Sequence, residues 1–301
     1  MTIKVGTSGF GIAQSKYLQL FTCVEVQHTF YQPPQISTLE RWRAAAPPDF
    51  EFVLKAWQLI THDAKSPTYR RLKKKLSDEE KQEAGYFRST PLVQAAWETT
   101  LACAKVLQAR TILFQCPASF KQTKENVSNL EKFFGSINRS ITASRNVLSE
   151  PPALAGGSSM QKRKLSLPAY AGGSDKDQLN FAWEPRGDWD PKVVKSICNN
   201  LDLWHAVDPF TSTSSTPDRL YFRLHGRNGW RYEYDDEELR ELIAILTTTK
   251  FKPGKVASGS PDNEGSYVFF NNVSMTQDAL RFQSMLDEGR TAGVSGANRA
   301  K

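Results

Sequence analysis

The chain has 301 residues, of which 39% are hydrophobic and 24% are charged, and this composition supplies a packed core and excludes wholesale disorder. No apolar run approaches the roughly 18 residues of a membrane-spanning helix, and the first ten residues lack the charged leader and apolar stretch of a secretory signal. The net charge is +7, and an excess of +4 lies in each of two segments, 65–81 and 139–176, which leaves the rest of the chain nearly neutral.

The four cysteines are scattered along the chain with no close pair. This usage is typical of buried thiols in a reducing compartment, and not of a disulfide framework or a zinc ribbon. We therefore expect a cytoplasmic protein with no membrane partner.

Eight short runs along the chain have the length and composition of strands. They cover residues 3–7, 23–27, 51–56, 111–115, 180–184, 203–208, 220–225 and 267–271. Helical patterns lie between most of them, at 39–46, 90–108, 124–138, 191–200, 236–248 and 275–286. The clearest pattern is 90–108, where Pro91 stands at the helix start, and Asp235 and Asp236 are candidate caps for the helix at 236–248.

Strands that alternate with helices pair in parallel through right-handed crossovers. Eight such units predict a closed TIM-like (β/α)8 barrel, which belongs to the α/β class. An open doubly wound sheet is the competing fold, and it usually has a glycine-rich phosphate loop after its first strand. The glycines Gly6, Gly9 and Gly11 follow the first strand here, but their spacing is not that of the GxGxxG loop.

Two segments do not fit the repeating pattern. Residues 140–178 are rich in Ser, Gly, Pro and Lys, which predicts a flexible insertion after the fourth strand. Residues 291–301 have the composition of a disordered tail. The expected organisation is therefore one barrel domain over 1–290, interrupted by the insertion and followed by the tail.

Several strands alternate between apolar and polar residues, although strands of a parallel barrel are normally apolar on both faces. In the second strand Val24 and Val26 share one face while Glu25 lies on the other, and in the seventh strand Phe222 opposes Arg223. The apolar face is expected to pack on the helices, so the polar face looks into the barrel.

The polar residues also lie late in each strand, at the carboxyl ends where active sites of such barrels form. Three acids and three bases balance one another there, which suits either an ion-pair network that closes the barrel or a site that binds an anion and moves protons. The predicted ring consists of Glu25, Gln27, Lys55, Gln115, Glu184, Arg186, Asp208, Arg223, His225 and Asn271.

Metal and covalent chemistry have weaker support in the sequence. The chain has four histidines and no HExxH or HxH pair, so a divalent cation, Mg²⁺ or Zn²⁺, is a weakly supported alternative, with Mg²⁺ held loosely by Glu25, Glu184 and Asp208. Lys55 suits a Schiff-base nucleophile if burial lowers its pKa, but an ion pair with a neighbouring carboxylate is the expected state. No cofactor is predicted.

Eight motifs follow one another in the order of a known family: VGTSGF, VEVQHTFYQPP, TLERWRAAAPPDFEFVLKAWQLITH, LFQCPASF, AWEPRGDW, VDPF, YFRLHG and YVFFNN. Through them the chain resembles the YecE-like family, the domain of unknown function 72, from about residue 3 to residue 286. The resemblance implies a TIM-like barrel without an established activity. It adds Tyr31, His62 and Asn272 to the candidate site residues.

Two functions follow as expectations. The first is an enzyme that acts on an anionic substrate, phosphorylated or nucleotide-like, at the carboxyl-terminal mouth of the barrel. The expected catalytic residues are Glu25, Lys55, Glu184 and His225, and the expected substrate-binding residues are Tyr31, His62, Gln115, Arg186, Asp208, Arg223, Asn271 and Asn272. The second is a nucleic-acid-binding protein without catalysis that uses the basic segments 65–81 and 162–164.

Overall fold

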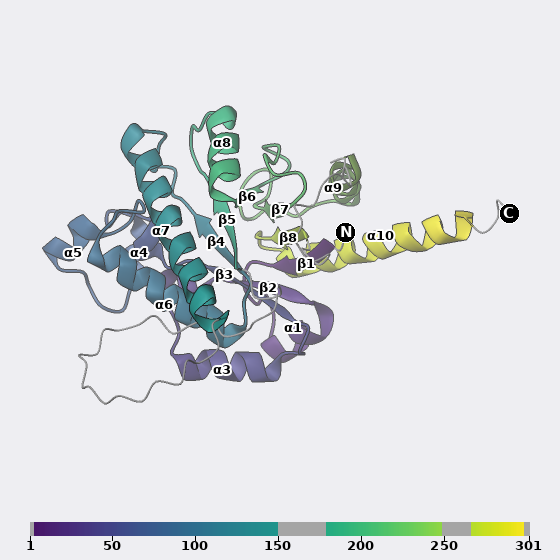
Figure 1. The fold of residues 1–301 in the computed structure, drawn as a ribbon. Coiled ribbons are helices and arrows are strands. Elements are labelled where there is room, and N and C mark those ends of the chain that lie inside the picture. The colour runs from purple at the N-terminus through teal and green to yellow at the C-terminus, as the bar shows by residue number, and fades with distance from the viewer. Residues whose placement is uncertain (1–2, 150–178, 249–265, 298–301) are drawn as a thin grey trace.

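The computed structural model describes residues 3–149, 179–248 and 266–297 (Figure 1). Eight parallel strands form one sheet in the order β1-β8-β7-β6-β5-β4-β3-β2. They are β1 (Ile3–Thr7), β2 (Cys23–Val26), β3 (Glu51–Lys55), β4 (Thr111–Gln115), β5 (Asn180–Glu184), β6 (Leu203–Val207), β7 (Tyr221–Leu224) and β8 (Ser266–Phe270).

The two ends of this sheet, β1 and β2, meet and nearly close it into a barrel. A parallel bridge joins Ser8 to Glu25, and the Gly9 amide donates to the Glu25 carbonyl at 2.8 Å. The close approach requires glycine at position 6, because a Cβ there would stand 2.5 Å from the Cys23 carbonyl oxygen. The predicted TIM-like barrel is confirmed, and the doubly wound alternative is excluded by the closure.

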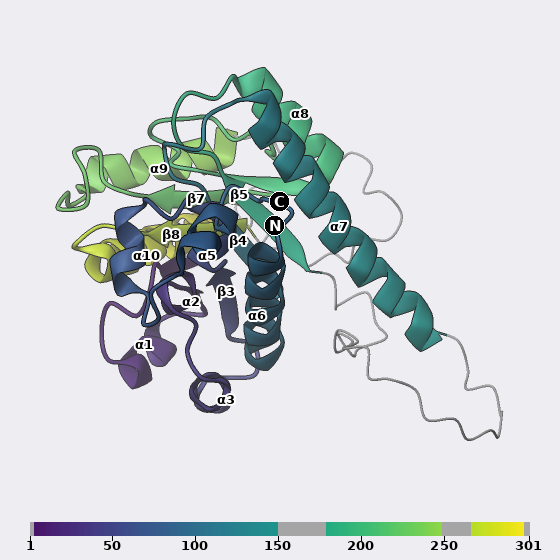
Figure 2. The same ribbon diagram turned by 90° about the vertical axis from the view of Figure 1, so that its left-hand side faces the viewer.

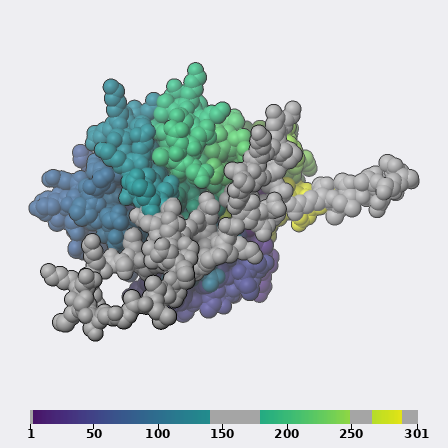
Figure 3. Space-filling model, viewed as in Figure 1, coloured from purple at the N-terminus to yellow at the C-terminus, as the bar shows by residue number. Residues whose placement is uncertain are grey.

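Helices separate most of the strands and cover the outside of the barrel. They are α1 (Gln14–Leu20), α2 (His28–Tyr31), α3 (Ile36–Ala45), α4 (Gln58–Thr61), the 3-10 helix η1 (Pro67–Arg71), α5 (Asp78–Glu83), α6 (Pro91–Leu107), α7 (Lys124–Ser149), α8 (Pro191–Leu201), α9 (Asp236–Thr248) and α10 (Met275–Ala297). Helix α3 packs across the end of α6 (Figure 2), and α7 and α8 lie side by side on one face of the molecule (Figure 3).

The predicted starts of α6 and α9 are confirmed, whereas α3 begins at Ile36, before the predicted range 39–46. Thr90 accepts a hydrogen bond from the Val93 amide and Pro91 occupies the first turn of α6. Asp235 accepts from the Glu238 amide at 2.9 Å while the Glu238 carboxylate accepts from the Asp235 amide at 3.0 Å, which forms a reciprocal cap for α9.

Two helices are longer than the sequence pattern indicated. Helix α7 continues to Ser149, into the segment predicted as an insertion, and α10 continues to Ala297, into the segment predicted as a tail. Neither stretch contains proline, and isolated glycine or serine weakens a helix without ending it. The rest of the predicted insertion, 150–178, and residues 298–301 lie outside the described part of the chain.

Apolar residues form two layers, one on each side of the strands. The outer layer packs between strands and helices and includes Phe52, Phe114 and Phe222. The inner layer fills the lower part of the barrel and consists of Cys23, Val53, Leu113, Ala182, Trp204, Ala206, Tyr221, Tyr267 and Phe269. Polar side chains begin above this inner layer, so the packed interior supports them from below. No helix in the described ranges is long and apolar enough to span a bilayer.

Candidate functional site

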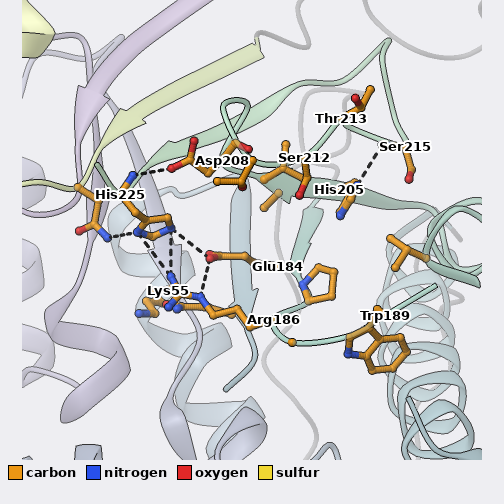
Figure 4. A pocket seen from close by; sticks show the side chains of 18 of the residues that line it. Lys55, Glu184, Arg186, Trp189, His205, Asp208, Ser212, Thr213, Ser215 and His225 are labelled. Atoms are coloured by element: carbon orange, nitrogen blue, oxygen red, sulfur yellow. Dashed lines mark hydrogen bonds and ion pairs between the residues drawn. The ribbon is translucent and has the colours of Figure 1, made fainter. Parts of the chain in front are cut away.

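A cavity of about 990 Å³ opens at the carboxyl ends of the strands. Residues that directly end or follow β3, β4, β5, β7 and β8 line it, and these are Lys55, Gln115, Glu184, His225 and Asn271. Figure 4 shows Lys55, Glu184, Arg186 and His225 together on one side of this cavity, and Trp189, His205 and several hydroxyl side chains on the other. The predicted location at the mouth of the barrel therefore coincides with a cavity.

Below this cavity, Arg223 joins two carboxylates from different strands. Its Nε donates to Glu25 Oε2 at 2.8 Å and its Nη2 to Glu25 Oε1 at 2.7 Å, while its Nη1 donates to Glu184 Oε2 at 2.5 Å. The side chains of Arg223 and Glu25 are 1% and 0% exposed. Three buried charges with complementary hydrogen bonds thus tie β7 to β2 and β5 across the barrel.

The Glu25 carboxylate also accepts hydrogen bonds from neutral groups. Tyr221 donates from its hydroxyl at 2.7 Å, Ser8 donates at 3.0 Å, and the Gln27 side-chain amide donates to the same carboxylate. Burial by itself would raise the pKa of Glu25, but the charge and hydrogen bonds of Arg223 outweigh it and hold the pKa below its ordinary value. Glu25 is therefore ionised and saturated with donors.

Glu184 connects this buried network to the cavity. Its Oε1 accepts from Arg186 Nε at 2.9 Å. His225 Nε2 lies 3.2 Å from Glu184 Oε1 and 3.1 Å from Arg186 Nη2, so the ring donates to the carboxylate in one tautomer and accepts from the guanidinium in the other. Asn271 contacts the opposite ring nitrogen at 2.9 Å. Although burial opposes it, Arg223 holds the pKa of Glu184 well below its ordinary value, and His225 and Arg186 add to this effect.

Asp208 fixes the backbone around this cluster. Its Oδ2 accepts from the His225 amide at 2.9 Å and its Oδ1 from the Phe210 amide at 3.1 Å. Both oxygens are thus used by the chain itself, although Asp208 lines the cavity. Its role is to position His225.

Lys55 lines the cavity and is 5% exposed. Its Nζ lies 3.5 Å from Gln27 Oε1 and 4.0 Å from the centre of the Phe30 ring. None of the ion pairs between described residues includes Lys55, so the expected ion pair with a carboxylate is wrong. Burial, followed by the charge of Arg223, lowers the pKa of Lys55 to about 7, although Glu25 and Glu184 act in the opposite direction.

Four predicted site residues do not line the cavity: Glu25, His62, Arg223 and Asn272. Arg223 was expected to bind substrate, but all of its nitrogens already contact carboxylates. His62 is buried with its Nδ1 2.8 Å from Thr61 Oγ1, and burial lowers its pKa to about 3, so it is neutral. Asn272 instead donates to the Tyr232 carbonyl at 2.7 Å and to Asp278 at 2.6 Å, which holds the loop after β8.

Tyr31 and Gln115 do line the cavity, as predicted for substrate contact. The Arg71 guanidinium lies over the Tyr31 ring at 4.3 Å, so the basic segment 65–81 meets the rim of the cavity at this residue. No described residue hydrogen-bonds to the side-chain amide of Gln115, which leaves its polar atoms for a ligand.

The side of the cavity opposite Lys55 was not predicted from the sequence. A loop follows β6 where most strands are followed by a helix, and Thr211, Ser212, Thr213 and Ser215 of this loop line the cavity together with His205. The His205 ring accepts from the Ser215 amide at 3.0 Å, which anchors the loop to β6. The run TSTSS at 211–215 was the available signal, since a strand-to-strand connection of hydroxyl residues is unusual in this pattern.

Within the described ranges no three His, Cys, Asp or Glu side chains converge as metal ligands would. The carboxylates proposed for Mg²⁺ do not meet one another, because the Arg223 guanidinium lies between Glu25 and Glu184, and Asp208 accepts backbone hydrogen bonds. The side chains present therefore do not fit that alternative.

The comparisons with known proteins agree with the fold. A family model described as "Protein of unknown function DUF72" matches residues 14–299. A DUF72 family protein from Enterococcus faecalis V583 has a similar structure, with a TM-score of 0.60 and 20% identity, over 95% of this chain and 98% of that one. One from Thermotoga maritima MSB8 has a TM-score of 0.54 and 20% identity, over 95% and 100%. No curated protein matches the chain. Since the family model spans nearly the whole sequence, the chain belongs to the DUF72 family.

Proposed function

We propose that this protein is an enzyme that binds a small anionic substrate, phosphorylated or nucleotide-like, in the cavity at the barrel mouth and transfers protons on it. One observation carries the proposal: among the charged groups of the described cavity lining, the cations keep free hydrogen-bonding capacity, while both carboxylates accept hydrogen bonds from the chain itself. Both oxygens of Glu184 and both oxygens of Asp208 accept hydrogen bonds from neighbouring donors. Lys55 and Arg186, in contrast, have donors left for a ligand.

Arg186 is the anion-binding residue in this proposal. Its side chain is 40% exposed and its Nε is fixed by Glu184, while no described residue accepts from its Nη1. A guanidinium held in this way presents a planar pair of donors that suits phosphate or carboxylate. Anion binding by Arg186 does not depend on the net charge of the chain, because the cavity contains nearly equal numbers of acids and bases.

His225 and Lys55 are the proton-transfer groups. The His225 ring is held from both sides by Glu184 and Asn271, so its position is fixed for proton transfer with a substrate. Lys55, with a pKa of about 7, changes its charge near neutral pH and is thus suited to accept a proton or to stabilise negative charge that develops on a substrate.

Titration calorimetry with inorganic phosphate and pyrophosphate tests the anion site. We expect binding by the unmodified protein and a loss of about tenfold or more in Arg186→Gln, since a charge-assisted contact contributes about 1.5–3 kcal/mol. Arg240→Gln is the matched control, because Arg240 is exposed on α9, away from the cavity. Equal phosphate binding by Arg186→Gln and Arg240→Gln would overturn the proposal.

A second candidate function is supported by the contact between Arg71 and Tyr31. This contact places the segment 65–81 at the cavity rim, with Lys73, Lys74 and Lys75 exposed beside it. A single-stranded nucleic acid would run along these cations and place one base in the cavity. The other proposed segment, 162–164, lies outside the described residues.

Filter binding with DNA and RNA at two salt concentrations distinguishes the two functions. A nucleic-acid binder has an affinity that falls steeply with salt, and for a single strand the replacement of the three lysines by glutamine reduces the slope of log K against log salt by about 2. An absence of binding at low salt removes the second candidate and leaves the first unaffected.

A further inference from the structure

The surroundings of Lys55 are unusual for a buried lysine. Its stem follows β3 into the mouth of the barrel, where its Nζ meets one amide oxygen at 3.5 Å and the face of Phe30. Buried lysines normally have a carboxylate partner, because an isolated buried ammonium costs several kcal/mol. Glu25 and Glu184 lie nearby, but Arg223 occupies both of them. Among the residues that the structure describes, Lys55 is therefore left without a counter-ion.

A lysine in this state is available as a nucleophile. Only the neutral amine has a lone pair, and with a pKa of about 7 it is neutral in about half of the molecules at pH 7, against roughly one in a few thousand for an ordinary lysine. Lys55 also lines the same cavity as Arg186, so a substrate held there by its anionic group reaches the amine (Figure 4).

We propose that Lys55 forms an imine with the carbonyl carbon of an aldehyde or ketone substrate whose phosphate or carboxylate group is bound by Arg186. This inference rests on the proposed function, because it needs the anion site, and it narrows the substrate class from anions in general to anionic carbonyl compounds. The cavity of about 990 Å³ accommodates such a small molecule with room to spare.

The atoms balance without any oxidant or reductant. The Nζ lone pair attacks the carbonyl carbon, the C–N bond forms, and the carbonyl π electrons move to oxygen. A proton passes from nitrogen to that oxygen to give a carbinolamine. The C–O bond then breaks, and the hydroxyl leaves as water with a proton from solvent, which leaves a protonated imine. Proton removal from the carbon next to the imine is the reaction that such an intermediate favours, and the cavity supplies His225 as an acceptor.

Trapping with sodium borohydride tests the imine. The full chain is incubated separately with dihydroxyacetone phosphate and with pyruvate, reduced, and examined by intact mass and peptide mapping. We expect one adduct per chain, located on Lys55, which forms on the order of a hundred times faster than any adduct on the exposed Lys195 at neutral pH. The rate should rise as pH rises through about 7. A preference for one of the two probes shows whether phosphate or carboxylate is the anionic group.

The variants separate this inference from the proposed function. Lys55→Arg and Lys55→Met should give no adduct at the mapped peptide, whereas Lys195→Met should behave as the unmodified protein. Inorganic phosphate should protect Lys55 from adduct formation. Circular dichroism identifies any variant that does not fold. Phosphate binding that depends on Arg186, together with no adduct on Lys55, overturns the imine and leaves the anion site intact. An adduct on Lys55 that forms equally fast in Arg186→Gln overturns the role given to Arg186.

Discussion

At the scale of single residues, the arrangement of charge around Arg223 determines what its neighbours do. Its guanidinium satisfies Glu25 on β2 and Glu184 on β5 at the same time. Because these carboxylates are occupied, Lys55 forms no ion pair with any residue of the described ranges. Because Glu184 is fixed from below, it orients Arg186 and His225 above. Arg223 is thus a positioning residue for the cavity without contact to a ligand.

Replacement of Arg223 by methionine leaves two buried carboxylates without their cation. We expect a loss of about 3–5 kcal/mol in the free energy of unfolding, as is typical when one partner of a buried ion pair is removed. Urea denaturation measures it. In Arg219→Gln, which breaks a surface pair with the 63% exposed side chain of Asp202, the loss should stay within about 1 kcal/mol. Similar losses in both variants would contradict the structural role of Arg223.

The low pKa of Lys55 makes the free energy of unfolding depend on pH in the neutral to alkaline range. Its pKa is about 7 in the folded chain and 10.5 when unperturbed, so between these values the unfolded chain binds more protons, and the free energy of unfolding rises with pH. The rise amounts to a few kcal/mol, at about 1.4 kcal/mol per pKa unit. The difference in unfolding free energy between the unmodified protein and Lys55→Met, measured from about pH 7 to about pH 10, should therefore shift in favour of the unmodified protein. A constant difference would show that Lys55 has an ordinary pKa.

The sequence predicted which residues face the barrel interior, but not which of them meet. Alternation within a strand and position near its carboxyl end identified Lys55, Glu184, Arg223 and His225. Arg186 and Arg223 looked equivalent, each a base near a strand end. Their difference depends on distances across the barrel between β2, β5 and β7, which no local pattern encodes.

At the scale of elements, local sequence patterns determine where the strands lie, whereas tertiary packing determines the short helices and the closure of the barrel. All eight strands lie within two residues of the predicted ranges, because short β-branched and aromatic runs between turn residues are distinctive. The sequence pattern did not predict the short helices α1, which has seven residues, and α5, which has six. The stability of such short helices depends on packing or capping more than on periodicity. The β1–β2 closure likewise depends on tertiary contacts, which are the Ser8–Glu25 bridge, the Gly9 amide hydrogen bond and the close approach at Gly6.

Gly6→Ala tests that closure. The added Cβ would stand 2.5 Å from a backbone oxygen of Cys23, so the strands must separate, and we expect a loss of about 1–3 kcal/mol as for other overpacked sites. The matched control is Gly135→Ala in α7, where the nearest atom to the new Cβ is the end of the Arg139 side chain at 3.6 Å. This control should be stabilised by up to about 1 kcal/mol. Thermal or urea unfolding of both variants measures the contrast, and a neutral Gly6→Ala would show that the barrel closes without close contact at this point.

At the scale of the whole molecule, the barrel has polar groups at both ends and an apolar layer between them. At the amino ends of the strands, Glu51 binds Lys4 and accepts a hydrogen bond from the Tyr267 hydroxyl at 2.7 Å. Tyr267 is 4% exposed and belongs to the inner apolar layer. At the carboxyl ends lies the open cavity with Arg186 and His225. This division agrees with the general behaviour of TIM-like barrels, in which one end stabilises the fold and the other carries the chemistry.

The two ends should therefore respond independently to substitution. Tyr267→Phe removes a buried hydrogen bond to a charged group, so we expect it to lower the free energy of unfolding by about 1–3 kcal/mol and to leave phosphate binding unchanged. Arg186→Gln removes a partner that is 40% exposed and leaves Glu184 paired with Arg223, so its effect on stability should stay within about 1 kcal/mol, while phosphate binding weakens about tenfold or more. Urea denaturation and phosphate titration give the unfolding free energy and the phosphate affinity of each variant, and these values test whether the two ends of the barrel are independent. If Tyr267→Phe weakens phosphate binding as much as Arg186→Gln does, the apolar layer does not separate the ends, and the affinity for anions is a property of the whole barrel instead of the cavity at its mouth.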